Sequence, residues 1–335
     1  MTQADTPKDP LSALLVCLAD GDFHSGDELG ESLGMSRAAV WKHLQKLTEL
    51  GLPLTSIRGR GYQVEGGLEL LEKERILGAL DPEARRRLNV LELFRATDST
   101  NVRALARGPA EPSGYVCLAE QQTAGRGRRG RAWVSPYGRN LYLSASWNFD
   151  GGAAALEGLS LAVGVAICRA LEASGLQGVR LKWPNDLLWR GRKLAGVLLE
   201  MTGDPVGQCR VVVGIGINLS MPAGAARGID QPWVDVSEAC REEGLAPLSR
   251  NRLAAELINQ LLPLLADYQR SGFSDYRNAW HARDAFLGQT VVLKSAQREQ
   301  LGVARGVDGS GALRLEVDGQ EQLCHGGELS MRAVS

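Results

Sequence analysis

The chain has few of the residues that build metal sites or disulfide frameworks. Its 335 residues include only four histidines, and these lack the paired spacing of zinc ligands. The six cysteines contain no Cys-x-x-Cys pair and stand at positions 17, 117, 168, 209, 240 and 324. Scattered cysteines of this kind indicate reduced thiols in the cytosol, so we expect no disulfide and no protein-built metal site.

Long hydrophobic runs and a strong excess of one charge are also missing. Residues 1–10 are polar and offer no apolar stretch for export, and the apolar run near residues 159–167 is too short to cross a bilayer. The net charge is −1, and 44% hydrophobic with 23% charged residues is ordinary for a soluble globular protein. We therefore expect a cytoplasmic protein of two or three domains with no membrane partner.

Glycine and arginine alternate through residues 125–131, which read Gly-Arg-Gly-Arg-Arg-Gly-Arg. Glycines allow the backbone to approach a ligand closely, and arginines offer paired donors to phosphate or carboxylate oxygens. A solvated basic loop or an RNA-binding tail has the same composition. The alternating apolar and polar residues at 140–147 predict a half-buried strand directly afterwards, which favours an ordered anion clamp.

A second dense segment spans residues 182–200. Turn residues at 184–186 and a bend at Gly191 separate short apolar runs, of which 194–200 is apolar enough to lie inside a sheet. We expect Lys182 and Lys193 at the ends of adjacent strands. Most lysines are surface charges, but one that enters so apolar a strand is more typical of a functional cation.

The N-terminal residues have the pattern of a winged helix-turn-helix. Helices are expected near 11–18, 27–33 and 37–50, followed by a strand, a glycine turn and a second strand over 55–64. Residues 35–63 contain five Lys or Arg against one acidic residue, as phosphate contacts require. A protein-interaction module is the alternative. The predicted DNA-binding residues are Ser36, which also caps the third helix, with Arg37, Lys42, His43, Lys46, Arg58 and Arg60.

Glycine and charge patterns predict an α+β protein of three domains. These are a winged helix-turn-helix at 1–66, a mixed α/β domain at 67–285 without the regular alternation of a Rossmann fold, and a small β-barrel at 286–335. A helix over 68–88 should break near Gly78 and Pro82. In the central domain we expect strands near 90–95, 115–119, 141–147, 179–183, 193–200 and 210–217, and helices near 99–106, 155–174 and 250–271. In the last domain we expect strands at 290–293, 302–307, 312–317 and 322–324.

Five motifs resemble, in order, the motif series of biotin protein ligases. They are Asp98-Ser99-Thr100-Asn101, Gln122 with Gly125 to Gly130, Lys182-Trp183-Pro184-Asn185-Asp186, Arg192-Lys193-Leu194-Ala195-Gly196 and Gly214-Ile215-Gly216-Ile217-Asn218. The flanking regions resemble the bifunctional members, which also repress the biotin operon. The resemblance implies a class II synthetase-like catalytic domain and an SH3-like C-terminal barrel.

The resemblance also implies the chemistry. Such a ligase uses ATP and Mg²⁺ to form biotinyl-5'-AMP, then transfers biotin to a lysine of the biotin carboxyl carrier protein of acetyl-CoA carboxylase. Two anions must meet, so converging cations are needed, and Arg126, Arg128 and Lys193 match the catalytic positions. The implied biotin-binding residues are Ser99, Thr100, Asn101, Gln122, Gly125, Arg126, Gly127, Arg128, Trp133, Lys193 and Gly196. The implied ATP or adenylate contacts are Lys182, Asn185, Asn218 and Trp233, with Asn218 near the magnesium.

In the bifunctional members the adenylate also favours a homodimer that binds operator DNA. Two other classes remain open at the level of sequence. A lipoate-ligase-like or aminoacyl-tRNA-synthetase-like enzyme has the same need for cations around an α-phosphate. A regulator that senses a ligand without catalysis would keep the helix-turn-helix but would not require all three cations.

Overall fold

The computed structural model describes residues 10–108, 110–222, 224–294, 299–326 and 329–333. The predicted absence of an export signal concerns mainly residues 1–9, which lie outside these ranges.

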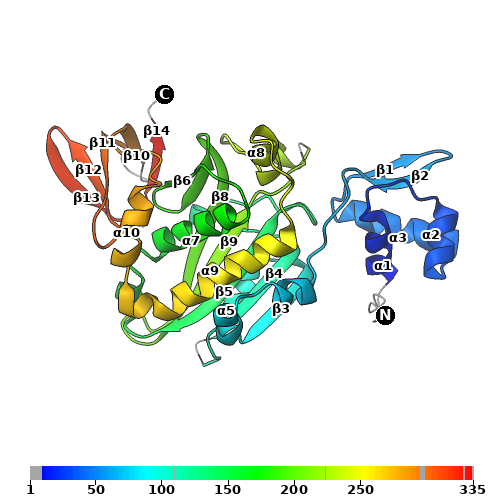
Figure 1. Cartoon of the computed structure of the whole chain (residues 1–335), viewed down its shortest axis with the longest axis horizontal. Coiled ribbons are helices and arrows are strands. Elements are labelled where there is room, and N and C mark those ends of the chain that lie inside the picture. The colour runs from blue at the N-terminus through cyan, green and yellow to red at the C-terminus, as the bar shows by residue number, and fades with distance from the viewer. Residues whose placement is uncertain (1–9, 109, 223, 295–298, 327–328, 334–335) are drawn as a thin grey trace.

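Three helices and a hairpin form the N-terminal unit, which stands to one side of the molecule (Figure 1). The elements are α1 (Pro10–Leu18), α2 (Gly26–Leu33), α3 (Arg37–Glu49), β1 (Leu54–Ile57) and β2 (Gly61–Val64). Local sequence sets the helix ends: Ser25 and Glu28 form a capping box, Gly34 ends α2 in the left-handed region, and the Ser36 hydroxyl accepts a hydrogen bond from Ala39 N. The three predicted helices and the wing are thus present.

The core of this unit extends into the next domain. Buried leucines of α1 and α3 pack together with Leu68 and Tyr137, which come from beyond the hairpin. Two hydrogen bonds add to this contact, from Gln121 Nε2 to Leu50 O and from Arg139 to Glu65 O. The N-terminal unit is therefore packed against the central domain.

A seven-stranded mixed sheet forms the centre of the molecule. Its strands are β3 (Val90–Thr97), β4 (Tyr115–Gln122), β5 (Leu141–Phe149), β6 (Val179–Lys182), β7 (Asp186–Trp189), β8 (Arg192–Gly203) and β9 (Cys209–Ile217). They are ordered β3-β4-β5-β9-β8-β7-β6, with β3 and β4 parallel and every other pair antiparallel. The β8–β9 hairpin lies at the middle of the sheet.

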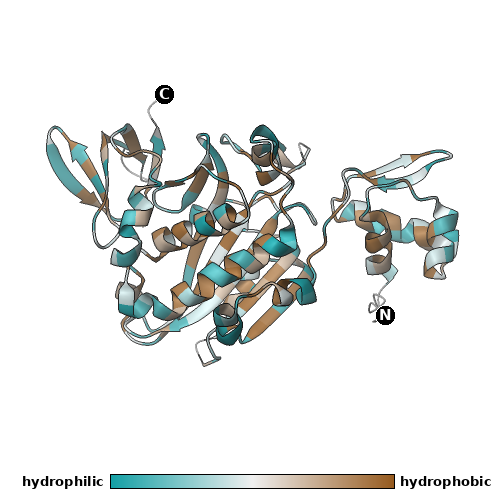
Figure 2. Cartoon of the chain, viewed as in Figure 1, coloured by the Kyte–Doolittle hydropathy of each residue, from teal (hydrophilic) through white to brown (hydrophobic). Residues whose placement is uncertain are grey.

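Helices cover both faces of this sheet. Side chains alternate along each strand, so every strand presents side chains to both layers of helices. Val116 and Leu118 pack with α7 and α9 on one face, whereas Tyr115 and Cys117 pack with α6 on the other. Figure 2 shows α7 and the central strands as mainly hydrophobic. The central helices are α4 (Lys73–Gly78), α5 (Pro82–Arg87), α6 (Thr100–Leu105), α7 (Leu159–Ala173), α8 (Val236–Glu242), α9 (Arg250–Ser271) and α10 (Ser274–His281).

The helix expected near 155–174 is shorter in the structure, because α7 begins at Leu159 and a separate 3-10 turn at Gly152–Leu156 precedes it. The stretch 152–173 therefore contains both elements. By length and composition alone it is apolar enough to cross a membrane. Most of it is buried inside the protein, where α7 packs against α9, as in the core helix of a globular domain.

A five-stranded antiparallel sheet forms the C-terminal unit. It contains β10 (Thr290–Lys294), β11 (Glu299–Val307), β12 (Leu313–Val317), β13 (Gln320–Cys324) and β14 (Ser330–Ala333). The pairing order is β13-β12-β11-β10-β14, and this sheet is the unit that the sequence predicted as a small barrel. It stands at the end of the molecule opposite the helix-turn-helix (Figure 1).

The structure corrects several sequence predictions. Strands β7 and β14 and helices α8 and α10 were not predicted, and α4 begins at Lys73 instead of residue 68. Lys182 and Lys193 do not end adjacent strands, because β7 pairs between β6 and β8. Helices α8 and α10 span only seven and eight residues, so each shows a single apolar repeat, too short to be recognised as a periodic pattern.

Candidate functional site

A cavity of about 420 Å³ lies between the central sheet and the C-terminal unit. Twelve of the fifteen predicted ligand-binding residues line it. They are Ser99, Thr100, Asn101, Gln122, Arg126, Gly127, Arg128, Trp133, Lys182, Asn185, Lys193 and Gly196. Phe286, Leu329 and Arg332 of the C-terminal unit also line it, so the cavity joins segments more than two hundred residues apart in sequence.

Glycines of β8 and β9 form the floor of the cavity. The Trp133 ring lies so close to Gly216 that a Cβ there would be 2.5 Å from Trp133 Cε2. A Cβ on Gly214 would likewise collide with the Asn101 side chain. Trp133 Nε1 is buried and has no hydrogen-bond partner in the part of the chain that the structure describes. The glycines keep this floor open, and the indole N–H is a donor available to a ligand.

Polar side chains from α6, β4 and β5 form one network on the wall of the cavity. Thr100 donates to Gln122 Oε1 from both its amide, at 2.9 Å, and its hydroxyl, at 3.1 Å. The Ser144 hydroxyl lies 2.7 Å from Thr100 Oγ1 and 2.6 Å from Asn101 Oδ1. Ser99, Thr100 and Asn101 are each 3% exposed. These neutral donors and acceptors suit a neutral polar ring.

The two clamp arginines have different surroundings. Arg126 is 43% exposed and forms an ion pair with Glu200 at 3.1 Å, while Asn101 Nδ2 donates to the same carboxylate at 2.7 Å. Arg128 donates to Asn185 Oδ1 at 3.0 Å and to Gly326 O at 2.6 Å in the C-terminal unit. The clamp loop is therefore held on one side by β8 and on the other by the C-terminal unit.

Two lysines share one buried carboxylate at the far end of the cavity. Lys193 Nζ lies 2.6 Å and Lys182 Nζ 3.3 Å from Asp186 carboxylate oxygens. Burial raises the pKa of Asp186, but Lys193 and Lys182 outweigh it and the net shift is downward. Asp186 thus stays ionised at neutral pH. It fixes two ammonium groups beside the cavity although their strands are not neighbours.

Three predicted residues do not line the cavity, namely Gly125, Asn218 and Trp233. Asn218 is 4% exposed, and its amide lies 3.4 Å from Lys193 O and 3.3 Å from Val234 O. Trp233 pairs with Lys193 through the backbone, and its neighbours 230–232 line the cavity. Gly125 packs against the Trp133 backbone. In this structure, these three residues lie behind the residues that line the cavity.

Sequence reasoning missed Ser144 and Glu200 and did not assign a role to Asp186. Ser144 and Glu200 lie in strands where their alternation looks like ordinary strand patterning. Only the sheet register brings them to Asn101. Asp186 was part of a quoted motif, and its position four residues after Lys182 in a turn was the available signal.

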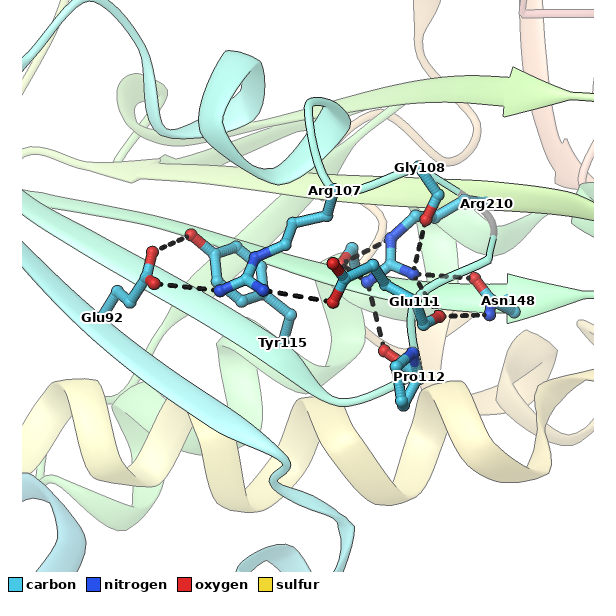
Figure 3. Close-up of polar contacts among 9 residues, drawn as sticks. Glu92, Arg107, Gly108, Glu111, Pro112, Tyr115, Asn148 and Arg210 are labelled. Carbon is cyan, nitrogen blue, oxygen red and sulfur yellow. Dashed lines mark hydrogen bonds and ion pairs between the residues drawn. The ribbon is translucent and has the colours of Figure 1, made fainter.

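A buried arginine supports the loop that follows α6. Arg210 is 0% exposed, and its guanidinium donates to the carbonyl oxygens of Gly108, Glu111 and Pro112 at 2.9, 2.7 and 3.2 Å. Figure 3 shows this cluster beside Arg107, which stacks on Tyr115 and pairs with Glu92. Burial lowers the pKa of Arg210. The cluster anchors the segment between α6 and β4, which both contribute to the cavity.

Most of the predicted DNA-binding residues lie on the surface of the N-terminal unit. Ser36, Arg37, Lys42 and Lys46 are exposed on or before α3, and Arg58 and Arg60 are exposed at the turn of the wing. His43 is the exception, since it is half-buried and its Nδ1 atom has no described hydrogen-bond partner. In the described residues no cluster of three or more His, Cys, Asp or Glu is arranged to hold a metal ion.

The fold and the cavity together define a cation-lined, ligase-type catalytic domain joined to a helix-turn-helix. Three family models match this arrangement. They are an HTH domain over residues 11–63, the biotin/lipoate A/B protein ligase family over 93–218 and the biotin protein ligase C terminal domain over 286–332.

Relatives cover nearly the whole chain. The bifunctional ligase/repressor BirA of Escherichia coli (strain K12) is 43% identical over 321 residues, 96% of this chain and 97% of that protein. Biotin–[acetyl-CoA-carboxylase] ligase of Paracoccus denitrificans is 40% identical over 65% of this chain and 91% of that protein. The chain therefore belongs to the biotin protein ligase family, in its bifunctional ligase/repressor branch.

A solved structure agrees with this assignment. The biotin protein ligase from Aquifex aeolicus in complex with biotin and ATP superposes with a TM-score of 0.62 at 25% identity, over 74% of this chain and 100% of that chain. It does not extend to the whole chain, whereas the E. coli relative matches nearly all of it.

Proposed function

We propose that this protein is an ATP-dependent biotin protein ligase that also represses transcription in response to biotin. It forms biotinyl-5'-AMP and transfers biotin to a lysine of the biotin carboxyl carrier protein of acetyl-CoA carboxylase. The observation that carries the proposal is one cavity in which Arg126, Arg128 and Lys193 converge beside a neutral polar network. Cations meet the need of the first half-reaction, and the polar wall suits the ureido ring.

The first half-reaction joins two anions. An oxygen of the biotin carboxylate forms a bond to the α-phosphorus of ATP, and the bond to the leaving pyrophosphate breaks. Arg126 and Arg128 bring the repelling groups together, and Lys193 stabilises charge between carboxylate and α-phosphate. Asp186 holds Lys193 in place through the 2.6 Å ion pair. In the second half-reaction the carrier lysine attacks the acyl carbon and AMP leaves.

The neutral end of biotin is assigned to the wall of the cavity. Ser99, Thr100, Asn101 and Gln122 supply donors and acceptors for the ureido group. Trp133 packs over the ring system, and its Nε1, which has no hydrogen-bond partner among the described residues, is a further donor. Gly125, Gly127 and Gly196 allow the backbone to approach closely. An adenylate is exposed to hydrolysis, so ordering of residues 125–131 and 220–232 over it would exclude water.

The triphosphate is assigned to the cationic end of the cavity. Lys182 and Arg128 provide charge, and Asn185 provides an amide beside Arg128. Asp186 is occupied by two lysines, so we propose that Mg²⁺ is held mainly by the triphosphate. Asn218 and Trp233 lie behind the described cavity. Their proposed roles near magnesium and adenine require the loop 220–232 to move.

Repression is assigned to the N-terminal unit. The exposed cations of α3 and the wing contact operator phosphates, with Ser36 at the start of the helix. Biotinyl-5'-AMP acts as corepressor by favouring a homodimer that places two winged helices on a palindromic operator. Self-association and the carrier protein compete for one surface.

We propose domain limits of 1–66, 67–285 and 286–335 in a cytoplasmic protein. The separate N-terminal core and the separate five-stranded sheet support these limits. Leu68 lies just past the first limit although it packs in the N-terminal core. The limit at residue 66 therefore divides the sequence, while the hydrophobic core continues across it.

The test of the ligase is ATP–pyrophosphate exchange with Mg²⁺, with biotin, lipoate and mixed amino acids offered in separate reactions. Exchange with biotin alone supports the proposal. Exchange with lipoate would indicate a lipoate ligase, the other kind of enzyme in the matched biotin/lipoate family. No exchange would favour a ligand sensor without catalysis. Operator binding that ignores biotin and ATP would contradict the corepressor role.

A further inference from the structure

The recognition helix exposes one large apolar side chain. Trp41 in α3 is 56% exposed, although the core side of the same helix is formed by Val40, Leu44 and Leu47, which are each at most 3% exposed. Trp41 lies off that buried stripe, so the three-helix core does not require an indole at this position.

The surroundings of Trp41 are polar and basic. Arg37 precedes it and Gln45 follows it by one helical turn, which places all three on adjacent positions of the surface. Arg37, Ala38, Lys42 and Gln45 are exposed. The small Ala38 leaves space beside the indole. Arg37 also forms an exposed ion pair with Asp27 at 3.6 Å. A hydrophobic group on a helix face that also presents exposed arginine and lysine side chains matches a partner with a charged backbone and apolar groups between its charges.

Duplex DNA is the partner that fits this charge distribution. Its phosphates match the cations of α3 and of the wing, and its major groove admits one α-helix. Within that groove the C5-methyl group of thymine is the apolar feature, and it is absent from the other three bases.

We infer that Trp41 is a specificity-determining residue that reads the thymine methyl group in the major groove. This inference rests on the repressor part of the proposed function. Gln45, one turn further along α3, has the amide that pairs with the N6 and N7 edge of adenine. Together these side chains select A·T pairs, while the neighbouring cations contribute affinity for any sequence.

The experiment begins with the full-length protein, biotin, ATP and Mg²⁺, and selects duplexes from a random DNA library. Selections run in parallel with Trp41→Ala, Trp41→Phe and the control Val16→Ala, which removes an equally exposed apolar side chain from α1. We expect the unchanged protein and V16A to enrich one motif with a fixed thymine. W41A should lose that preference, and W41F should keep part of it.

The second measurement replaces that thymine by deoxyuridine, which removes only the methyl group. Binding by the unchanged protein should weaken roughly fourfold, as expected for losing burial of one carbon-sized apolar group, whereas W41A should not respond. The dependence of affinity on salt should be equal for both proteins, because an indole releases no counterions.

Each other result overturns the inference. An identical motif for W41A, or no response of the unchanged protein to deoxyuridine, means that Trp41 does not read thymine. Normal DNA readout with weakened self-association in W41A would make Trp41 a protein contact. If the unchanged protein enriches no motif, the repressor function fails together with this inference, while biotin-dependent exchange separately reports the ligase.

Discussion

The arginines buried in the central domain and the arginines of the clamp loop use the same side chain for opposite purposes. Arg210 and Arg250 are 0% and 3% exposed, and the chain supplies them with carbonyl or carboxylate acceptors. Arg126 is 43% exposed and is held by a partly exposed carboxylate. A guanidinium stabilises the fold where the protein supplies its acceptors, and it is free to bind where a ligand can replace them.

Removing a buried arginine should have the largest effect on stability. Arg250→Met leaves Glu120 buried without its cationic partner, although the Leu71 amide still donates to it, so we expect the free energy of unfolding to fall by roughly 3–5 kcal/mol. The control Arg270→Met breaks an exposed pair with Asp267 and should cost less than about 1 kcal/mol. Urea titration measures both, and equal losses would erase the distinction between buried and exposed arginines.

Removing a cavity cation should instead affect catalysis. Lys193→Ala takes away the ammonium assigned to the developing charge, so biotin-dependent exchange should fall by about 10²–10³, the usual effect of losing one such group. Lys294→Ala in β10, which breaks an ion pair with Glu299 away from the cavity lining, is the control and should retain full exchange. Retained exchange in K193A would remove Lys193 from the catalytic set.

A half-buried acid at the junction with the C-terminal unit should respond to pH. Burial raises the pKa of Asp284 from 3.8 to about 6, and its Oδ2 atom has no described partner. The unfolded chain loses this proton at lower pH than the folded protein, so stability falls as pH rises from about 4 to 6. A shift of about two units corresponds to at most about 3 kcal/mol.

Asp284→Asn should therefore raise the melting temperature at pH 8 and leave it nearly unchanged at pH 4. Thermal unfolding at the two pH values measures this difference. Asp275→Asn, an exposed change in α10, is the matched control and should shift neither value. A destabilised D284N at pH 8 would show that the ionised carboxylate has a partner that stabilises it.

The smallest effect should come from changing Glu200, the carboxylate that pairs with Arg126. Glu200→Gln removes the negative charge that competes with a ligand for Arg126, so biotin should bind roughly twofold to fivefold more tightly, as expected for a partly exposed ion pair. Biotin methyl ester has no carboxylate, and its affinity should stay the same. Calorimetry with both ligands is decisive, because equal changes would assign Glu200 to the Asn101 network instead.

The elements that could be predicted from sequence are those with local causes. The capped helices α2 and α3 and the glycine-turned wing depend on residues within a few positions of one another. The clamp loop at residues 125–131 and the segment 182–200, which contains Lys182 and Lys193, were recognisable because their combinations of residue types are unusual. Elements too short to show a full periodic pattern, such as α8, α10 and β7, were missed.

By itself, the sequence determined which side chains are available for the chemistry, where most elements begin and end, and which family the motifs resemble. The tertiary structure alone decided which partners those side chains have. It placed Glu200 beside Arg126, inserted β7 between the strands of Lys182 and Lys193, and brought Gly326 to Arg128. The physical reason is that a contact across seventy or more residues depends on strand order and register, which no short window of sequence contains.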